Sequence, residues 1–447
     1  MPSPTPEVAS PDRALRPLHR VRDFRLFWLS RVLAGAGSAV AYVAMPVLVY
    51  ERTGSPLLVS FVAAGEAMPY VFFGLLAGAL ADRLDRRRVM VAADLANSAC
   101  LATVPLAAAV HSLTAFHIVA VAFVSSTLYV FFDAAGYGVV PAVVGRERIA
   151  QANSLIWGAE TTVQIIGTAM AGLLIGVLGT TGVLALQAAT FLASALLVGA
   201  LALPAGVRAA SSGNQRLLDS VKEGLRFLWR QPALRVMTAC GCLQSFAGGA
   251  FLGQLVIFAD RGLGLAESDS RVGLLFTAWS VGGVLGSIVL PWLLRRVDAM
   301  RVMRALLPVS SVLGLLTVTT DDWRLALPAV AAWGTAYLMV IVNTVTYAQS
   351  ITPEDLQGRV NTTRRMLSSG IGVPAGAMTA GFVTAASGVR PGLLLAVVAV
   401  ALASVLAWSR PRALDGNRDR DGGGDGGGGG DANGRFERPL RGGGADD

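Results

Sequence analysis

The chain has 447 residues, of which 53% are hydrophobic and only 15% charged, and its mean hydropathy is +0.57. Soluble globular proteins of this size carry about a quarter charged residues, so the composition excludes an ordinary soluble enzyme and indicates an integral membrane protein. The formal net charge of +8 would suit a nucleic-acid partner only if the basic residues formed one patch, and they do not.

In chain order, apolar segments of about 20 residues or more alternate with short polar turns, and each segment is long enough to cross the hydrocarbon core as a helix. Residues 1–22 are rich in Pro and Arg, without the apolar stretch of a signal peptide, and predict a disordered cytoplasmic tail. A first half at residues 23–203 follows, with helices predicted at about 24–50, 55–81, 89–110, 114–140, 150–178 and 181–203.

Residues 204–232 form the longest polar interruption between the apolar segments. Leu217, Val221, Leu225 and Leu228 share one helical face, which predicts an amphipathic helix on the cytoplasmic membrane surface. A second half at residues 233–410 has helices predicted at about 233–259, 271–294, 301–319, 324–350, 359–387 and 391–409. Residues 411–447 are dominated by Gly, Asp and Arg and predict a disordered cytoplasmic tail.

The basic residues fall on alternate sides of the predicted crossings. One side holds 26 Lys and Arg residues, against five on the other side, which are Arg52, Arg261, Arg271, Arg324 and Arg390. By the positive-inside rule, both termini are expected in the cytoplasm of a multi-pass protein of the cell membrane. The basic excess is therefore interpreted as topology, and no nucleic-acid partner is expected.

A charged loop, residues 78–88, interrupts two long apolar segments and contains Asp82 and four arginines. A weaker copy runs from Gly286 through Arg295 and Arg296, and Gly78 and Gly286 are 208 residues apart. A second pair of landmarks, Ile149 and Leu356, is 207 residues apart. Two similar offsets indicate a duplicated unit of six helices, and in transporters such halves enclose a site near the midplane.

The loop motif of Gly78, Asp82, Arg83, Arg86 and Arg87, together with the six-plus-six layout, resembles the major facilitator superfamily over about residues 22–410. The opening Phe24-Arg25-Leu26-Phe27-Trp28 and Phe131-Phe132-Asp133 resemble its exporter branch, which includes macrolide efflux pumps and enterobactin-type siderophore exporters. The resemblance implies an all-α membrane protein with twelve transmembrane helices in two six-helix halves.

The resemblance also implies a gating role for the charged loop. It places Asp82 against the N-terminal dipole of the eleventh helix, near Arg359, and it pairs Arg86 with Asp133 at the end of the fourth helix. The chain departs from the family pattern in having Asp85 where glycine is usual, and its fourth predicted helix contains neither Arg nor Lys. Those departures concern the coupling to protons more than the class of transport.

Ionisable and amide side chains inside predicted spans are costly unless they are paired or wetted, so they mark candidate cavity residues. The candidates for a proton and substrate cavity are Arg31, Glu66, Glu160, Gln164, Asn343 and Gln244. Arg31 and Glu66 could instead form a structural salt bridge, and Glu66 and Glu160 are the candidate proton carriers. Asp94 is interpreted as a capping or structural acid.

The sequence favours a monomeric secondary transporter that exports an amphipathic small molecule, such as a drug, an antibiotic or a siderophore-like metabolite, using the proton gradient and no cofactor or metal. A phosphate-binding loop of the Gly-x-x-x-x-Gly-Lys type is absent from the sequence, which argues against an ATP-driven pump. A symporter that imports a polar nutrient and a non-transporting membrane scaffold remain as alternatives. The sequence does not distinguish the substrate.

Overall fold

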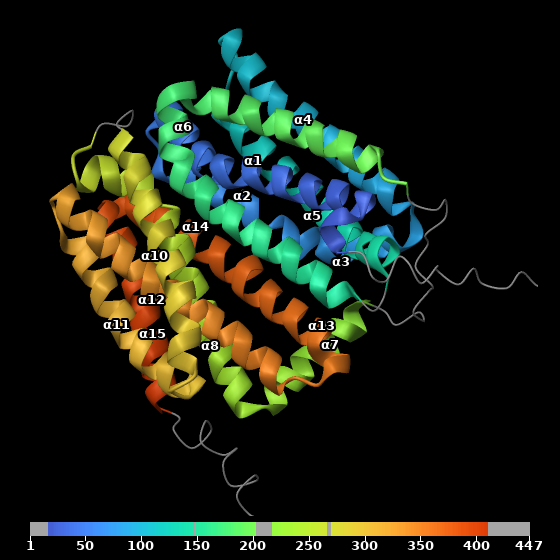
Figure 1. Ribbon diagram of the computed structural model, residues 1–447. Coiled ribbons are helices and arrows are strands. Elements are labelled where there is room, and N and C mark those ends of the chain that lie inside the picture. The colour runs from blue at the N-terminus through green and yellow to red at the C-terminus, as the bar shows by residue number, and fades with distance from the viewer. Residues whose placement is uncertain (1–16, 146–147, 203–216, 266–269, 410–447) are drawn as a thin grey trace, which may run out of the picture.

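The computed structural model describes residues 17–145, 148–202, 217–265 and 270–409, and these ranges are helical apart from short turns (Figure 1). Most of both predicted tails and most of the connection at 204–216 lie outside the described residues. Within the predicted connection the structure has helix α7 (Leu217–Arg230), which packs against α13 (Glu354–Arg365) through Leu228 and Val360.

Over the described residues, the first half has six α-helices. They are α1 (Arg22–Thr53), α2 (Pro56–Ala67), α3 (Pro69–Arg83), α4 (Arg86–Ala109), α5 (Ala115–Val144) and α6 (Ile149–Gly199). Helices α2 and α3 together are the predicted second crossing, divided at Met68 before Pro69 because proline cannot donate a backbone hydrogen bond within a helix. Gly179, at φ 71°, interrupts α6 and separates the predicted fifth and sixth crossings.

The second half consists of α8 (Pro232–Leu252), α9 (Leu255–Ile257), the π-helical turn η4 (Phe258–Gly262), α10 (Ser270–Leu294), α11 (Ala299–Thr319), α12 (Trp323–Ile351), α13, the π-helical turn η5 (Met366–Gly372), α14 (Val373–Ser387) and α15 (Val389–Ser409). Among the described helices, ten are long and apolar enough to span a membrane, or eleven when the bent pair 232–252 and 255–262 counts as one span. The helices follow the order of the twelve predicted crossings once α6 is divided at Gly179.

Matched breaks show that the two halves repeat one plan. Gly54 and Gly264, which end corresponding segments with φ 57° and 66°, are 210 residues apart. Gly179 and Gly388, with φ 71° and 98°, are 209 residues apart. These offsets agree with the spacing of 207 to 208 residues found in the sequence. Figure 1 shows the first half in blue to green at the upper right and the second half in yellow to red at the lower left.

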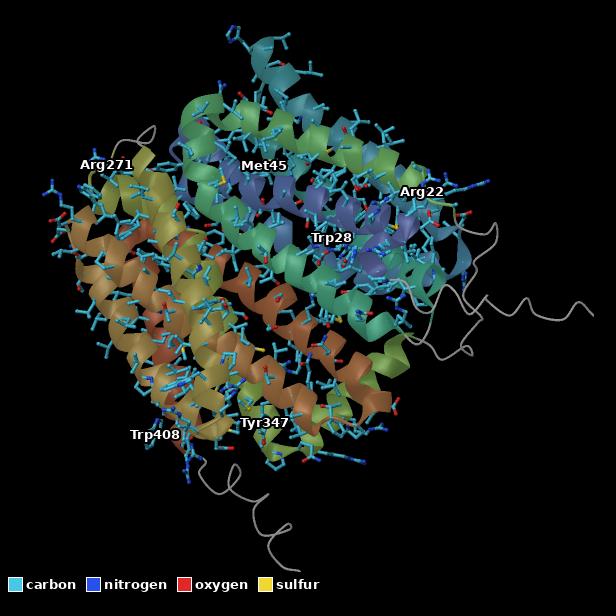
Figure 2. All side chains as sticks on the ribbon, viewed as in Figure 1. Arg22, Trp28, Met45, Arg271, Tyr347 and Trp408 are labelled. Atoms are coloured by element: carbon cyan, nitrogen blue, oxygen red, sulfur yellow. The ribbon has the colours of Figure 1, made fainter. Side chains whose placement is uncertain are left out.

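The bundle has two chemically different ends. At the basic end, α1 begins at Arg22 and α4 begins at Arg86 with Asp85 as its N-cap. At the far end, α1 stops at Thr53 and α10 begins close to Arg271, whose guanidinium lies 5.3 Å from the ring centre of Trp323. Figure 2 places Arg271 at the upper left, away from Tyr347 and Trp408 at the bottom.

The halves meet along four helices. Helix α6 packs against α10, and α2 packs against α14. At the α6–α10 crossing Gly172 lies against Gly273, and a Cβ on either residue would collide with the backbone of the other. Small residues allow such close approach of membrane helices. The central space between the halves is bordered mainly by α1, α2, α5 and α6 of the first half and by α12 and α14 of the second half.

Candidate functional site

A cavity of about 580 Å³ opens in the middle of the bundle. The first half supplies nearly all of its wall, including Tyr42, Glu66, Glu160 and Gln164, whereas the second half supplies Leu338 and Val373. On α1, Gly35, Ser38 and Tyr42 share one helical face and line the cavity. The remaining lining residues are mostly small or apolar: Ala41, Met45, Ala63, Ala67, Tyr70, Leu101, Ala122, Ser125, Ser126, Tyr129, Thr161, Ile165, Gln187 and Phe191. A volume of this size accommodates a drug-sized ligand.

Below the cavity wall, Arg31 holds two carboxylates at once. Its Nε donates to Oε1 of Glu160 at 2.6 Å, and its Nη2 donates to Oδ1 of Asp133 at 2.8 Å. Arg31 and Asp133 are buried, and the guanidinium also lies 5.5 Å from the ring centre of Phe132. Arginine suits this position because its planar group presents several donors in a fixed arrangement. The three groups form a triad, Arg31–Asp133–Glu160, that joins α1, α5 and α6.

The triad corrects two expectations. Arg31 forms its ion pairs with Asp133 and Glu160, so the alternative of an Arg31–Glu66 salt bridge is wrong. Arg86 donates to the carbonyl oxygens of Gly138 and Ala81 at 2.6 and 3.4 Å, and Asp133 is paired with Arg31. The expected Arg86–Asp133 pair is therefore replaced by an Arg86–Gly138 contact one and a half turns further along α5. Gly138 permits that contact, because a Cβ there would collide with the Arg86 guanidinium.

Glu66 lines the central cavity without joining the triad. It also borders a small adjoining pocket with Tyr42 and Phe276, at the boundary between the two halves. Its Oε2 atom is buried and makes no hydrogen bond within the described residues. A carboxylate in this setting is costly unless it is protonated or paired with a cation.

The other residues of the charged loop differ in their exposure and in their contacts. Arg83 is exposed, and Arg87 donates to the carbonyl of Gly199 at the end of α6. The backbone of Asp82 lies in α3, but its side chain is outside the described set, so its gating role stays a prediction. A Cβ on Gly78 would meet open space, and the structure gives no packing reason for glycine there.

The predicted amide residues separate into two groups. Gln164 lines the cavity. Asn343 is fully buried outside this cavity and donates to the carbonyl of Ala299 at 2.7 Å, which connects α12 to the start of α11. Gln244 is also fully buried and does not line this cavity.

Asp94 is buried inside α4 and does not cap it, and neither of its carboxylate oxygens has a hydrogen-bond partner among the described residues. The N-cap of α4 is Asp85, which accepts from the backbone NH of Arg88 at 3.1 Å. Asp94 lies two turns further into the helix, fully buried, with Ser194 of α6 beside it.

The second half contributes an aromatic cluster that the sequence analysis did not identify. Phe251, Trp279 and Trp333 lie with ring centres 4.5 to 5.7 Å apart, and Tyr337 extends the cluster 5.0 Å from Trp279. The signal was present in part, because Trp333 and Tyr337 are four residues apart and share a helical face. Trp279 and Phe251 come from other helices, and local spacing cannot join them.

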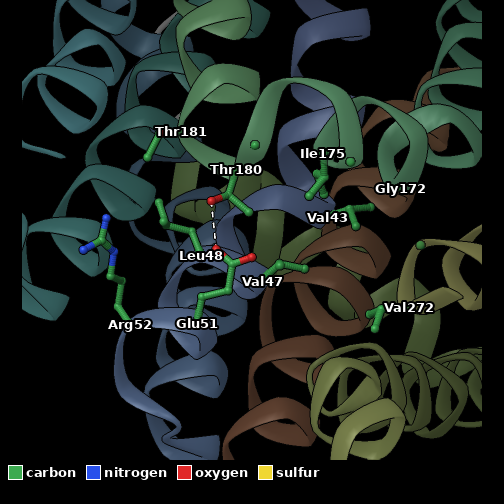
Figure 3. A pocket seen from close by; sticks show the side chains of 13 residues that line it. Val43, Val47, Leu48, Glu51, Arg52, Gly172, Ile175, Thr180, Thr181 and Val272 are labelled. Carbon is green, nitrogen blue, oxygen red and sulfur yellow. Dashed lines mark hydrogen bonds between the residues drawn. The ribbon is translucent and has the colours of Figure 1, made fainter. Parts of the chain in front are cut away.

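The far end is closed by contacts between the halves. Tyr50 donates to Oδ2 of Asp260 at 2.6 Å, and Arg261 donates to the carbonyl of Gly54 at 2.8 Å. A second pocket of about 320 Å³ lies here between α1, α6 and α10 (Figure 3). Within it, Thr180 donates to Glu51 at 2.9 Å, as the dashed line in Figure 3 shows. The two halves are thus joined at the end opposite the charged loop.

Residues 13–417 match the family described as transmembrane secretion effectors. The chain is 30% identical over 394 residues to the multidrug efflux pump Tap of Mycolicibacterium fortuitum, covering 84% of this chain and 95% of that protein. It is 24% identical over 223 residues to macrolide efflux protein A of Streptococcus pyogenes, covering 50% and 55% of the two chains.

Solved structures show the same fold at low sequence identity. A bacterial homologue of the human lysosomal transporter Spinster, in an inward-facing and unoccupied conformation, superposes with a TM-score of 0.72 at 14% identity. The match covers 91% of this chain and 98% of that chain.

Proposed function

This chain belongs to the transmembrane secretion effector family of major facilitator transporters, and we propose that it exports an amphipathic small molecule across the cell membrane in exchange for protons. The observation that carries the proposal is the central cavity, which combines a drug-sized volume, a mainly apolar wall and two acidic side chains. The names of the relatives, a multidrug pump and a macrolide efflux protein, support export rather than uptake.

The proposed mechanism is alternating access. In this structure Tyr50–Asp260 and Arg261–Gly54 join the halves at the far end, and the positive-inside rule assigns that end to the exterior and the basic end, with both termini, to the cytoplasm. A substrate would then enter from the cytoplasmic side and leave after the far-end contacts open. A ligand can shift such an equilibrium only by binding one state better than the other.

Two acids in the cavity wall support the exchange of protons. Among the described residues, the buried Oε2 of Glu66 has no hydrogen-bond partner, so a proton would relieve its cost of burial. Glu160 already has Arg31 as a partner, so protonating it changes the pairing of the triad. We propose that Glu66 is the acid that contacts the substrate. We propose that protonation of Glu160 changes the ion pairing between α1, α5 and α6.

Transport into everted membrane vesicles tests the proposal. Vesicles from cells that express the chain should accumulate radiolabelled erythromycin, a macrolide, or the lipophilic cation ethidium when respiration acidifies the lumen, and a protonophore should abolish the accumulation. Vesicles that express the Glu66→Gln and Glu160→Gln double variant are the matched control. Accumulation only by intact cells would favour the nutrient symporter, and absence of transport in both directions would favour the scaffold.

A further inference from the structure

The triad and the charged loop contact the same short stretch of α5. Arg31 reaches this stretch at Asp133 and lies against Gly136, where a Cβ would sit 3.2 Å from Nη1 of Arg31. Arg86 reaches it at the carbonyl of Gly138. The stretch from Asp133 to Gly138 is about one and a half helical turns. Arg31 therefore connects the cavity to this segment, and Arg86 connects the segment to the charged loop.

The two carboxylates of the triad are unequal. The Glu160 side chain is 24% exposed and lines the cavity, whereas the Asp133 side chain is 10% exposed and does not line it. A proton or a cationic group arriving through the cavity reaches Glu160 first. Because two carboxylates share one guanidinium, protonation of Glu160 leaves Arg31 and Asp133 as a neutral pair.

We infer that Arg31 is a positioning residue that transmits the protonation state of Glu160 through Asp133 and α5 to Arg86 and the charged loop, an inference that rests on the proposed exchange of protons. With Glu160 ionised, Arg31 is held between α6 and α5. When a proton binds Glu160, the Arg31–Glu160 ion pair is lost, and Arg31 relaxes onto Asp133. The displacement of the guanidinium against Gly136 shifts the segment whose Gly138 carbonyl holds Arg86.

Other charged and titratable groups surround the triad and belong to the same electrostatic unit. Tyr129 comes from α5 itself, and Asp94 contributes from α4. Tyr137 of α5, Tyr70 of α3 and Arg365 of α13 lie in the same surroundings, with the Arg365 guanidinium 4.8 Å from the Tyr70 ring centre. Arg365 belongs to the second half, so its electrostatic interaction with Asp133 depends on the distance between the two halves.

The test measures the gate and not transport, so it can fail separately from the proposed function. In purified protein with Cys100, Cys240 and Cys242 replaced by alanine, Leu84→Cys places a thiol in the charged loop and Val110→Cys places one at the far end of α4. Maleimide labelling of both is compared at acidic and alkaline pH. The ratio of the two rates cancels the ordinary pH dependence of thiol reactivity.

We expect the labelling ratio to change about fivefold or more between the two pH values, the lower range of a typical coupling between sites. Glu160→Gln should fix the ratio at its acidic value. A triple variant replaces the triad with neutral side chains: Arg31→Gln, Asp133→Asn and Glu160→Gln. Because it leaves no charge of the triad unpaired, the protein should still fold, and the pH response of the labelling ratio should be lost. Arg31→Lys should retain only part of it, because an ammonium cannot reproduce the forked geometry.

A pH response of wild-type size in Glu160→Gln or in the triple variant would overturn the inference, as would the absence of a response in the parent protein. A normal response in a protein that moves no substrate in vesicles would instead contradict the proposed function alone.

Discussion

The two halves of the molecule share a backbone plan but bury different side chains at their centres. The first half contains the ion-paired triad, in which Arg31 and Asp133 are buried and Glu160 faces the cavity. The second half buries rings, with Trp333 fully enclosed and its Nε1 donating to Ser310 at 3.2 Å. The matched glycine breaks, at offsets of 209 and 210 residues, show that this difference was built on one repeated framework.

The difference indicates a division of labour between the halves. A buried ion pair contributes little net stability, because the cost of removing two charges from water offsets their attraction. Buried aromatic rings are mainly stabilising, through their large apolar area and their contacts with one another. The first half is therefore expected to carry the chemistry that responds to protons and substrate, and the second half to provide a rigid wall against which the first half moves.

The largest effect that this comparison predicts follows from removing the arginine of the triad. Arg31→Ala leaves the buried carboxylate of Asp133 and the cavity-lining carboxylate of Glu160 without their cation, and it should lower the free energy of unfolding by about 3–5 kcal/mol. Unfolding in detergent, followed by tryptophan fluorescence, measures it. The neutral triple variant of the triad should recover most of the loss. If Arg31→Ala unfolded like the parent protein, the triad would not be a buried ion network.

The next largest effect is a loss of export with no change in the free energy of unfolding. Glu66→Gln keeps the shape of a side chain whose Oε2 has no hydrogen-bond partner within the described residues, so folding should be unchanged. Export should fall about a hundredfold, equivalent to about 2.7 kcal/mol, because the cavity loses the acid that meets the substrate.

Transport into everted vesicles, normalised to the amount of folded protein, checks this second prediction. The matched control is Glu51→Gln, the same chemical change in the far-end pocket, where Thr180 donates to Glu51. Equal losses in the two variants would show that Glu66 has no special place in the cavity.

The order of the membrane-spanning helices could be predicted from the sequence, because it follows from the alternation of long apolar segments with short polar turns. Arg31, Gly35, Ser38 and Tyr42 fall on one helical face, and the last three line the cavity. The boundary between the predicted fifth and sixth helices, 150–178 and 181–203, falls at Gly179, where the chain adopts a φ that residues other than glycine avoid.

The pairing inside the site could not be predicted in the same way. Asp133 lies 102 residues from Arg31 and Glu160 lies 129 residues from it, and no local pattern specifies which charges meet at such separations. The resemblance paired Asp133 with Arg86, whereas in the structure the cation that pairs with Asp133 is Arg31 of α1. Asn343 looked like a cavity residue because it is polar within an apolar span. Its burial against the carbonyl of Ala299 serves helix packing instead.

A smaller effect is expected in the aromatic cluster. Trp333→Phe removes the hydrogen bond to Ser310 and leaves a small void, and it should lower the free energy of unfolding by about 1–2 kcal/mol. Export per folded molecule should be unchanged, because Trp333 does not line the cavity. Trp229→Phe, at an exposed ring, is the matched control and should alter neither quantity. A selective loss of export in Trp333→Phe would break the proposed division of labour.

The smallest effect lies where the two halves touch at the far end. Tyr50→Phe deletes only the hydroxyl that donates to Asp260 of the second half, and one such bond to a charged group is worth about 1.5 kcal/mol. The protein should stay folded while the population open at the far end rises about tenfold. Maleimide labelling of Val272→Cys, a position buried beside the far-end pocket, in protein without the three native cysteines measures that population. Tyr347→Phe, at the basic end, should leave the rate unchanged. If Tyr50→Phe also leaves it unchanged, closure at this end must depend on the remaining contacts between the halves, which are the hydrogen bond from Arg261 to the carbonyl of Gly54 and the packing of Gly172 against Gly273.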